Sequence, residues 1–171
     1  MEELAGARIG STFNFYGRGD RAPLLRERLV AYLDERRDAR FLVVGEAAGY
    51  RGARVSGLAF TSERQLTGAG PAEASATIVQ RTLAELGAAE DVLLWNLVPT
   101  HPHRPGEAAS NRPPSRAEIA AARPFLERLA AGRRVVPVGR LAHAALGGTY
   151  VRHPSHGGAT AFGAGLAEAL A

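Results

Sequence analysis

Three short apolar runs, separated by stretches with helical spacing, most constrain the fold of this chain. Phe41–Val44 and Val92–Trp95 contain no charged residue, and Val135–Val138 has the same character. Short continuous runs of this kind are typical of strands that are buried on both faces of a parallel sheet. The alternation of strand and helix therefore predicts a three-layer α/β/α sandwich. Its central, mostly parallel sheet would have about four strands, joined by right-handed crossovers.

The expected helices follow from apolar spacing and from capping residues. One helix is predicted from Pro23 to about Asp38, and a second from about Ala72 to Leu86, where Gly87 ends it. Ser115 with a glutamate three residues later forms a capping-box pattern that opens a third helix. The remaining expected elements are a short helix around 141–146, a fourth strand at Tyr150–Val151 and a last helix from about Ala159.

Length and composition limit the class of protein. A chain of 171 residues has the usual size of one domain, so residues 1–171 are expected to form a single domain. The absence of cysteine excludes disulfides, a thiol nucleophile and cysteine-ligated zinc or iron-sulfur clusters. Met1–Gly10 lacks the order of a signal peptide, and no apolar run approaches the ~20 residues that span a bilayer. These features predict a cytoplasmic protein that does not associate with membranes.

The charge of the chain is carried by arginine alone. All 21 basic residues are arginines, against 17 acidic residues, which gives a net charge of +4. Guanidinium groups contact phosphates through forked donors. Because the net charge is small, attraction of an anionic partner must come from local patches.

Unusual segments follow three of the expected strands. They are Gly45–Tyr50, which continues through Gly57–Thr61, then Asn96–Pro99, and His153–Gly158. In open parallel sheets, ligands bind outside the carboxyl ends of the strands. Together these segments offer an acid, an aromatic ring, an amide and an imidazole, so they form the expected active site.

In their order and spacing, these segments resemble the motifs of the uracil-DNA glycosylase superfamily. The most similar branch has a first motif Gly-Glu-Ala-Pro-Gly, followed by a Gly-x-Pro-Phe element. Ala48 and Ala59 stand where the prolines of these motifs stand, and the cysteines that hold an iron-sulfur cluster in members of the superfamily are absent. The resemblance implies a monomeric, monofunctional DNA-repair enzyme. It would flip uracil, or another deaminated base, out of DNA and hydrolyse its N-glycosidic bond without a metal or organic cofactor.

The resemblance also assigns roles to individual residues. It assigns Glu46 to activating water or balancing charge, and His153 to the contact with the leaving base. The base-binding residues would be Ala47, Tyr50, Phe60 and Asn96. The DNA-binding residues would be Arg112, Ser155, His156, Gly157 and Gly158, with the two glycines in a loop that enters the minor groove.

The chemistry of base excision accounts for these residue types. Flipping a nucleotide costs roughly a few kcal/mol, and stacking on a ring such as Phe60 contributes about 1–3 kcal/mol. The amide of Asn96 can pair with O4 and N3–H of uracil, whereas cytosine presents the opposite donor pattern. An imidazole donor at His153 would stabilise the negative charge on the departing base.

Exclusion of thymine calls for a steric wall. Thymine differs from uracil by one methyl group, and a group of that size is worth only ~1–3 kcal/mol in a pocket. We expect Tyr50 to supply the wall, with Arg51 turned towards DNA.

Other interpretations remain open at this point. Glu46 could cap a loop, Phe60 could belong to the core and Asn96 could be a turn residue. The whole chain could be a noncatalytic module that binds nucleic acid or a nucleobase on the same fold. It could also be a metal-dependent hydrolase whose ligands are the imidazoles of His101, His103, His153 and His156.

Overall fold

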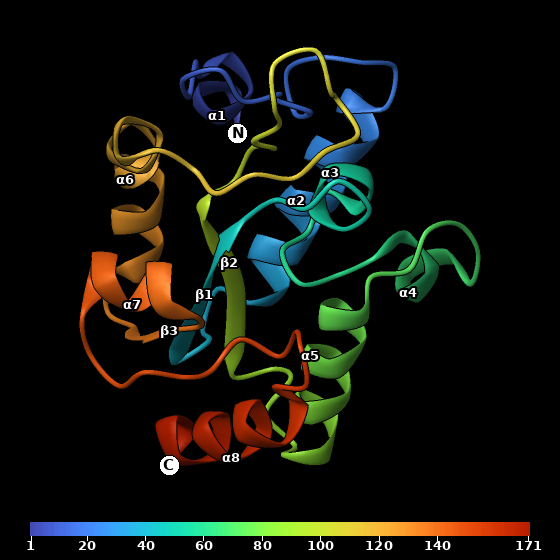
Figure 1. The fold of residues 1–171 in the computed structure, drawn as a ribbon. Coiled ribbons are helices and arrows are strands. Elements are labelled where there is room, and N and C mark those ends of the chain that lie inside the picture. Colours follow the sequence, from blue (N-terminus) through green and yellow to red (C-terminus); the bar gives the residue numbers. More distant parts are fainter.

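The computed structural model describes residues 1–171 and contains a parallel sheet between two layers of helices (Figure 1). The strands are β1 (Phe41–Ala47), β2 (Val92–Val98) and β3 (Arg134–Pro137), in the spatial order β2-β1-β3. In the parallel register, Gly45 of β1 lies opposite Asn96 of β2. The predicted three-layer α/β fold is confirmed, with three strands in the sheet.

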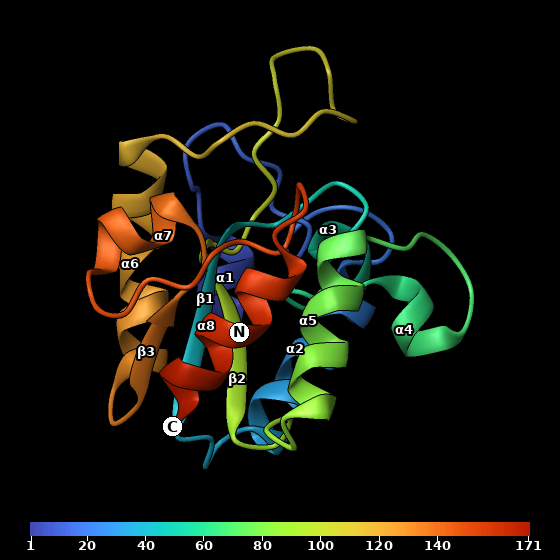
Figure 2. The same ribbon diagram turned by 60° about the horizontal axis from the view of Figure 1, so that its bottom comes forward.

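Helices cover both faces of the sheet. They are α1 (Glu2–Gly6), α2 (Ala22–Glu35), α3 (Ala53–Ser56), α4 (Glu63–Thr67), α5 (Ala74–Glu85), α6 (Arg116–Ala130), α7 (Arg140–Leu146) and α8 (Ala159–Leu170). Figure 2 shows α6 and α7 on one side of the strands and α5 on the other, and α8 packs on the same face of the sheet as α5. None of the helices has the length and apolar character that crossing a bilayer requires.

Alternation of side chains along the strands divides the core in two. On one face, strand residues such as Leu42, Val44 and Trp95 pack with residues of α2, α6 and α7. On the other face, strand residues such as Val43 and Leu94 pack with residues of α5 and α8. Each central strand is therefore buried on both faces, as its uniformly apolar sequence predicts.

The expected fourth strand is reduced to a single bridge. Val151 pairs with Val138 in parallel orientation. Its N–H donates to the carbonyl of Pro137, and its carbonyl accepts from the N–H of Gly139. The next bond of this ladder would join the N–H of His153 to the carbonyl of Gly139. The chain turns into α7 at Gly139, and that carbonyl accepts from the N–H of His143, so the ladder does not continue.

The strands extend further than their apolar runs. β1 continues to Ala47 and β2 to Val98, so Glu46 and Asn96 lie within the carboxyl ends of strands rather than in the loops after them. The capping box at Ser115 is confirmed, because its side chain accepts from the N–H of Glu118 and its own N–H donates to the Glu118 carboxylate. Helices α1, α3 and α4 are short and were not expected from the sequence.

Candidate active site

Phe60 and Asn96 meet over Gly45. A Cβ atom on Gly45 would lie 2.8 Å from Oδ1 of Asn96 and closer still to the ring of Phe60. Residue 45 must therefore be glycine, because the ring and the amide occupy the space of any side chain there. By strand alternation, Gly45 and Asn96 both face the α5 and α8 side of the sheet.

The amide of Asn96 has no partner in the protein. The residue is only 6% exposed, and its side chain makes no hydrogen bond with the rest of the chain. The only fully buried side-chain polar atom without a partner is Nε1 of Trp95, so the amide atoms of Asn96 keep some contact with solvent. The donors and the acceptor of this amide are therefore not used within the chain.

Phe60 is held in an unfavourable backbone conformation. Its φ of 49° lies in the left-handed region, which bulky residues rarely adopt. Gln80, from α5, donates to the Phe60 carbonyl at 3.1 Å and to the Thr61 hydroxyl at 3.0 Å. The Ser56 hydroxyl donates to the Thr61 carbonyl at 2.6 Å. Gln80 therefore fixes the turn that presents the ring, a role that no sequence motif indicated.

The ring of His153 lies beside that of Phe60, with their centroids 6.4 Å apart. The N–H of Ser155 donates to Nδ1 of His153 at 3.2 Å, and the Ser155 hydroxyl lies 2.7 Å from the same nitrogen. Because Nδ1 accepts, the proton of the neutral ring lies on Nε2. Burial, and secondarily the charge of His156, lowers the pKa of His153. At neutral pH the imidazole is therefore uncharged, and its Nε2–H has no acceptor within the chain.

Glu46 is half-buried near the end of β1. Its carboxylate forms no ion pair or hydrogen bond within the chain, and burial raises its pKa. Because successive side chains of a strand point to opposite faces, the Cβ of Glu46 points to the face opposite Asn96, at the carboxyl edge of the sheet. Its neighbour Ala47 packs with the small apolar cluster of Ile9 and Val98. The roles of Glu46 and Ala47 stay predictions.

Tyr50 joins the loop after β1 to the loop after β2. The guanidinium of Arg54 lies 4.1 Å from the centroid of its ring, and the ring of His101 lies 5.8 Å away. The Tyr50 N–H donates to the side chain of Asn111 at 2.9 Å, and Nδ1 of His101 lies 2.8 Å from the Ala48 carbonyl. These contacts tie the two loops together, while the proposed role of Tyr50 against thymine stays a prediction.

A second carboxylate lies against the loop after β1. One oxygen of Glu73 lies 2.5 Å from the position of a Cβ on Gly49, and the other is closer still to that of Gly52. The carboxylate makes no hydrogen bond within the chain, and burial raises its pKa. A side chain at either glycine would displace this carboxylate. No motif in the sequence marks Glu73.

The guanidinium of Arg112, an expected DNA contact, is already hydrogen-bonded within the chain. Arg112 donates to both oxygens of the Glu118 carboxylate at 2.7 and 2.8 Å, and to the His103 and Pro113 carbonyls. Its guanidinium therefore orders the long loop after β2, and this leaves it little freedom for a phosphate. DNA binding by Arg112 stays a prediction.

The loop of residues 153–158 closes tightly. The Ser155 hydroxyl lies between Nδ1 of His153 and Nδ1 of His156, at 2.7 and 3.0 Å. A Cβ on buried Gly158 would collide with the His153 carbonyl. His156 and Gly157 are exposed at the tip, both with positive φ. Glycine at 158 therefore permits loop closure, whereas 156 and 157 are presented outward.

The histidines do not form a metal-ligand set. His101 stacks on His103 with centroids 5.8 Å apart, and His153 and His156 share the Ser155 hydroxyl. No group of three or more histidine, aspartate or glutamate side chains is placed to hold a metal ion. The interpretation as a histidine-ligated metal hydrolase thus lacks its ligands.

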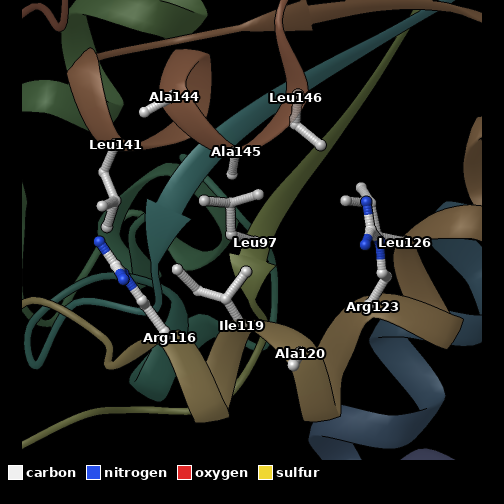
Figure 3. Close-up of a pocket in the computed structure, with 10 residues that line it drawn as sticks. All are labelled: Leu97, Arg116, Ile119, Ala120, Arg123, Leu126, Leu141, Ala144, Ala145 and Leu146. Atoms are coloured by element: carbon white, nitrogen blue, oxygen red, sulfur yellow. The ribbon is translucent and has the colours of Figure 1, made fainter.

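Four hollows of the surface are lined by residues other than Phe60, Asn96 and His153. One of them, of about 420 Å³, is an apolar groove between α6 and α7 (Figure 3). Leu97 at its floor faces the side of the sheet opposite Asn96, so this groove is separate from the site.

The fold and these side chains together define a class of protein. It is a three-layer α/β protein in which an unpartnered amide, a strained aromatic residue and a neutral imidazole gather near the carboxyl edge of a parallel sheet. The family model described as the uracil DNA glycosylase superfamily matches residues 32–166, and the chain belongs to this superfamily.

Comparison with solved structures agrees with this assignment at the level of the fold. The chain is similar to the crystal structure of wild-type SMUG2 from Pedobacter heparinus, with a TM-score of 0.68 and 15% sequence identity. The match covers 96% of this chain and 90% of that one. A search of curated proteins gave no match.

Proposed function

We propose that the protein is a monofunctional DNA glycosylase of base-excision repair that removes uracil, or a related deaminated base, from DNA. The observation that carries the proposal is the amide of Asn96, which has no partner within the chain and lies beside Phe60 at a residue that is only 6% exposed. A flipped uracil stacked on the ring would present O4 and N3–H to this amide. Cytosine has a donor in place of O4 and an acceptor at N3, so it would be matched only by an amide rotated by half a turn. Selection against cytosine therefore requires that the amide be held with its N–H₂ group towards O4.

Cleavage would use the groups around this base. The bond between C1′ of the sugar and N1 of uracil breaks, and the electron pair leaves with the base. The neutral His153, with its proton on Nε2, would donate to O2 of the departing uracil and stabilise its negative charge. Glu46 would orient the water whose oxygen bonds to C1′ and would take up its proton. The uracil anion then takes up a proton, and Glu46 returns its own proton to the solvent, so the products are free uracil and an abasic site.

Family membership and the absence of a histidine ligand set favour this reaction over metal-dependent hydrolysis. A protein that binds a nucleobase without cleaving it would keep the same pocket. Base release is therefore the property that separates the two functions. Within the proposal, the protein acts as a monomer in the cytoplasm.

The test is incubation with oligonucleotides that carry uracil, hypoxanthine, xanthine or a G·T mismatch, followed by cleavage of abasic sites. We expect strand cleavage at uracil. Asn96→Asp replaces the amide donor by an acceptor, so excision should fall by ~10²-fold or more while the fold is retained. Release of no base from any substrate would overturn the proposal. Unchanged excision by Asn96→Asp would show that Asn96 does not contact the base.

A further inference from the structure

A basic cavity of about 320 Å³ lies beside the amino-terminal segment. It is lined by residues 7–14 together with Arg18 and His103. Figure 1 shows this segment and the long loop after β2 at the same end of the molecule. None of the residues assigned to the base site lines this cavity.

The cavity carries positive charge that nothing in the chain neutralises. Arg8 and Arg18 are exposed, and neither takes part in any ion pair or side-chain hydrogen bond. No acidic residue lines the cavity. The nearest carboxylate, that of Glu118, lies behind Gly10 but is already paired with Arg112. The two guanidinium groups are thus available to an anion.

The backbone adds donors to the same cavity. The N–H groups of Gly10 and Ser11 donate to no acceptor within the chain. Gly10 has a φ of +55°, and a turn of this kind can direct successive N–H groups into one concavity that suits anions. Forked arginine donors and free backbone N–H groups together match the oxygens of a phosphate.

Hydrogen bonds connect the segment that lines the cavity to the loop after β1. Phe13 and His101 exchange two backbone hydrogen bonds, at 2.8 and 3.0 Å. His101 reaches the Ala48 carbonyl through Nδ1 and stacks on His103, which lines the cavity. An anion held here would therefore be fixed relative to the loop that follows Glu46.

We infer that this cavity binds a backbone phosphodiester of DNA close to the nucleotide that is flipped. The inference rests on the proposed function, which supplies DNA as the ligand. Phosphate contacts fix the register of a protein on DNA without reading its sequence. A phosphate clamp next to the site would hold the strand while one nucleotide rotates out.

The experiment compares two double variants. Arg8→Ala/Arg18→Ala removes the cavity charges. Arg37→Ala/Arg134→Ala removes two exposed arginines at the opposite edge of the sheet, where Arg37 precedes β1 and Arg134 begins β3. Both variants lose two positive charges, so they match in net charge. Thermal melting of each checks that the fold is retained.

The probe is a single-stranded oligonucleotide with one 2′-fluoro-2′-deoxyuridine, which resists cleavage, and its affinity is measured at several salt concentrations. Loss of one phosphate contact lowers the slope of log K against log salt by about 0.7 for single strands. We expect this decrease for Arg8→Ala/Arg18→Ala and an unchanged slope for the control. Equal slopes for the two variants would overturn the inference.

Replacing single phosphates of the probe by uncharged methylphosphonates locates the contact. The wild type should lose affinity at one linkage near the uridine, and Arg8→Ala/Arg18→Ala should be insensitive at that linkage. Sensitivity that persists in this variant would also overturn the inference. A wild type that releases no uracil overturns the proposed function itself. A wild type that releases uracil, with equal slopes for both variants, overturns only the phosphate site.

Discussion

At His153, one backbone hydrogen bond decides which nitrogen can act. The Ser155 N–H occupies Nδ1, so Nε2 carries the proton of the neutral ring. A serine side chain is not needed for this contact, because the donor belongs to the backbone. The imidazole is therefore ready as a neutral donor throughout the neutral pH range.

This arrangement predicts the effect of His153→Ala and the pH profile of the wild type. Removal of the donor should lower the single-turnover rate of uracil release by ~10²-fold or more. Because burial lowers the pKa of His153, the ring stays neutral down to and somewhat below the usual 6.5. Glu46, whose pKa is raised by burial, becomes protonated as the pH falls and then cannot act as the base, so the wild-type rate should fall at lower pH. An unchanged rate for His153→Ala, or an effect of this variant on DNA affinity alone, would contradict the role of His153.

Tyr50 gives a prediction about discrimination. Truncation by Tyr50→Ala should free volume beside C5 of the flipped base and raise activity on G·T-mismatched thymine relative to uracil. The measurement is base release from matched oligonucleotides that carry either base. The ring also packs on Arg54 and His101, so its removal could disturb the loop itself. Loss of uracil activity without gain on thymine makes Tyr50 a support of the loop.

At the scale of elements, the ion pair of Glu118 with Arg112 joins the start of α6 to the long loop after β2. Glu118 is only 3% exposed, and the hydrogen bonds from Arg112 lower its pKa to about 2. A carboxyl group with a lowered pKa in the folded state stabilises that state above its unfolded pKa. This stabilisation is lost as the pH falls through the folded pKa.

Glu118→Gln should therefore lower the free energy of unfolding at pH 7 by about 3 kcal/mol. The difference from the wild type should shrink as the pH falls from the usual glutamate value of 4.5 towards about 2. Chemical denaturation over this range measures it. Glu107→Gln is the control, because Glu107 pairs with Arg104 at the exposed surface and should matter little. Equal effects of the two variants would contradict a structural role for Arg112.

The elements that the sequence predicts best are those whose partners lie close along the chain. Apolar runs indicate the centres of the strands, and the Ser115 capping box indicates the start of α6. The ends of β1 and β2 were missed because Glu46 and Asn96 are polar and are recruited into strands by pairing with neighbouring backbone. The fourth strand is reduced to one bridge because its partner strand ends at Gly139, where α7 begins, and this ending was not evident from the residues around Val151.

The candidate site shows the same limit. The motif residues Gly45, Phe60, Asn96 and His153 could be grouped from the sequence by their resemblance to a family. Gln80 and Glu73 could not, because each acts on a loop that is distant in sequence and belongs to no motif. Free and paired arginines likewise look identical in sequence. Only the contacts distinguish the ion-paired Arg112 from the unpaired Arg8.

For the whole molecule, charge governs the encounter with DNA. The net charge is only +4, and ten ion pairs within the chain neutralise many of the arginines. Binding should therefore depend on a few local contacts, and each contributes to the salt dependence.

We expect the affinity of the wild-type protein for DNA to fall steeply, in a log-log relation, between about 50 and about 200 mM salt. Fluorescence anisotropy with a labelled oligonucleotide measures it. An uncharged peptide nucleic acid of the same sequence is the control and should bind weakly at all salt concentrations. Affinity that does not change with salt would count against DNA as the substrate.

The left-handed backbone at Phe60 has a consequence for timing. The unfavourable free energy of this backbone conformation is offset during folding, and the hydrogen bonds from Gln80 keep the conformation in place afterwards. Within the proposed function, a flipped nucleotide would meet a ring whose backbone already has the conformation that presents it. No rearrangement of this backbone then has to precede capture of the base, which competes with the return of the base into its stack. Within the proposed function, the fixed position of the Phe60 ring would favour capture of the base. The rate at which damage is recognised would then be limited by the motion of the DNA.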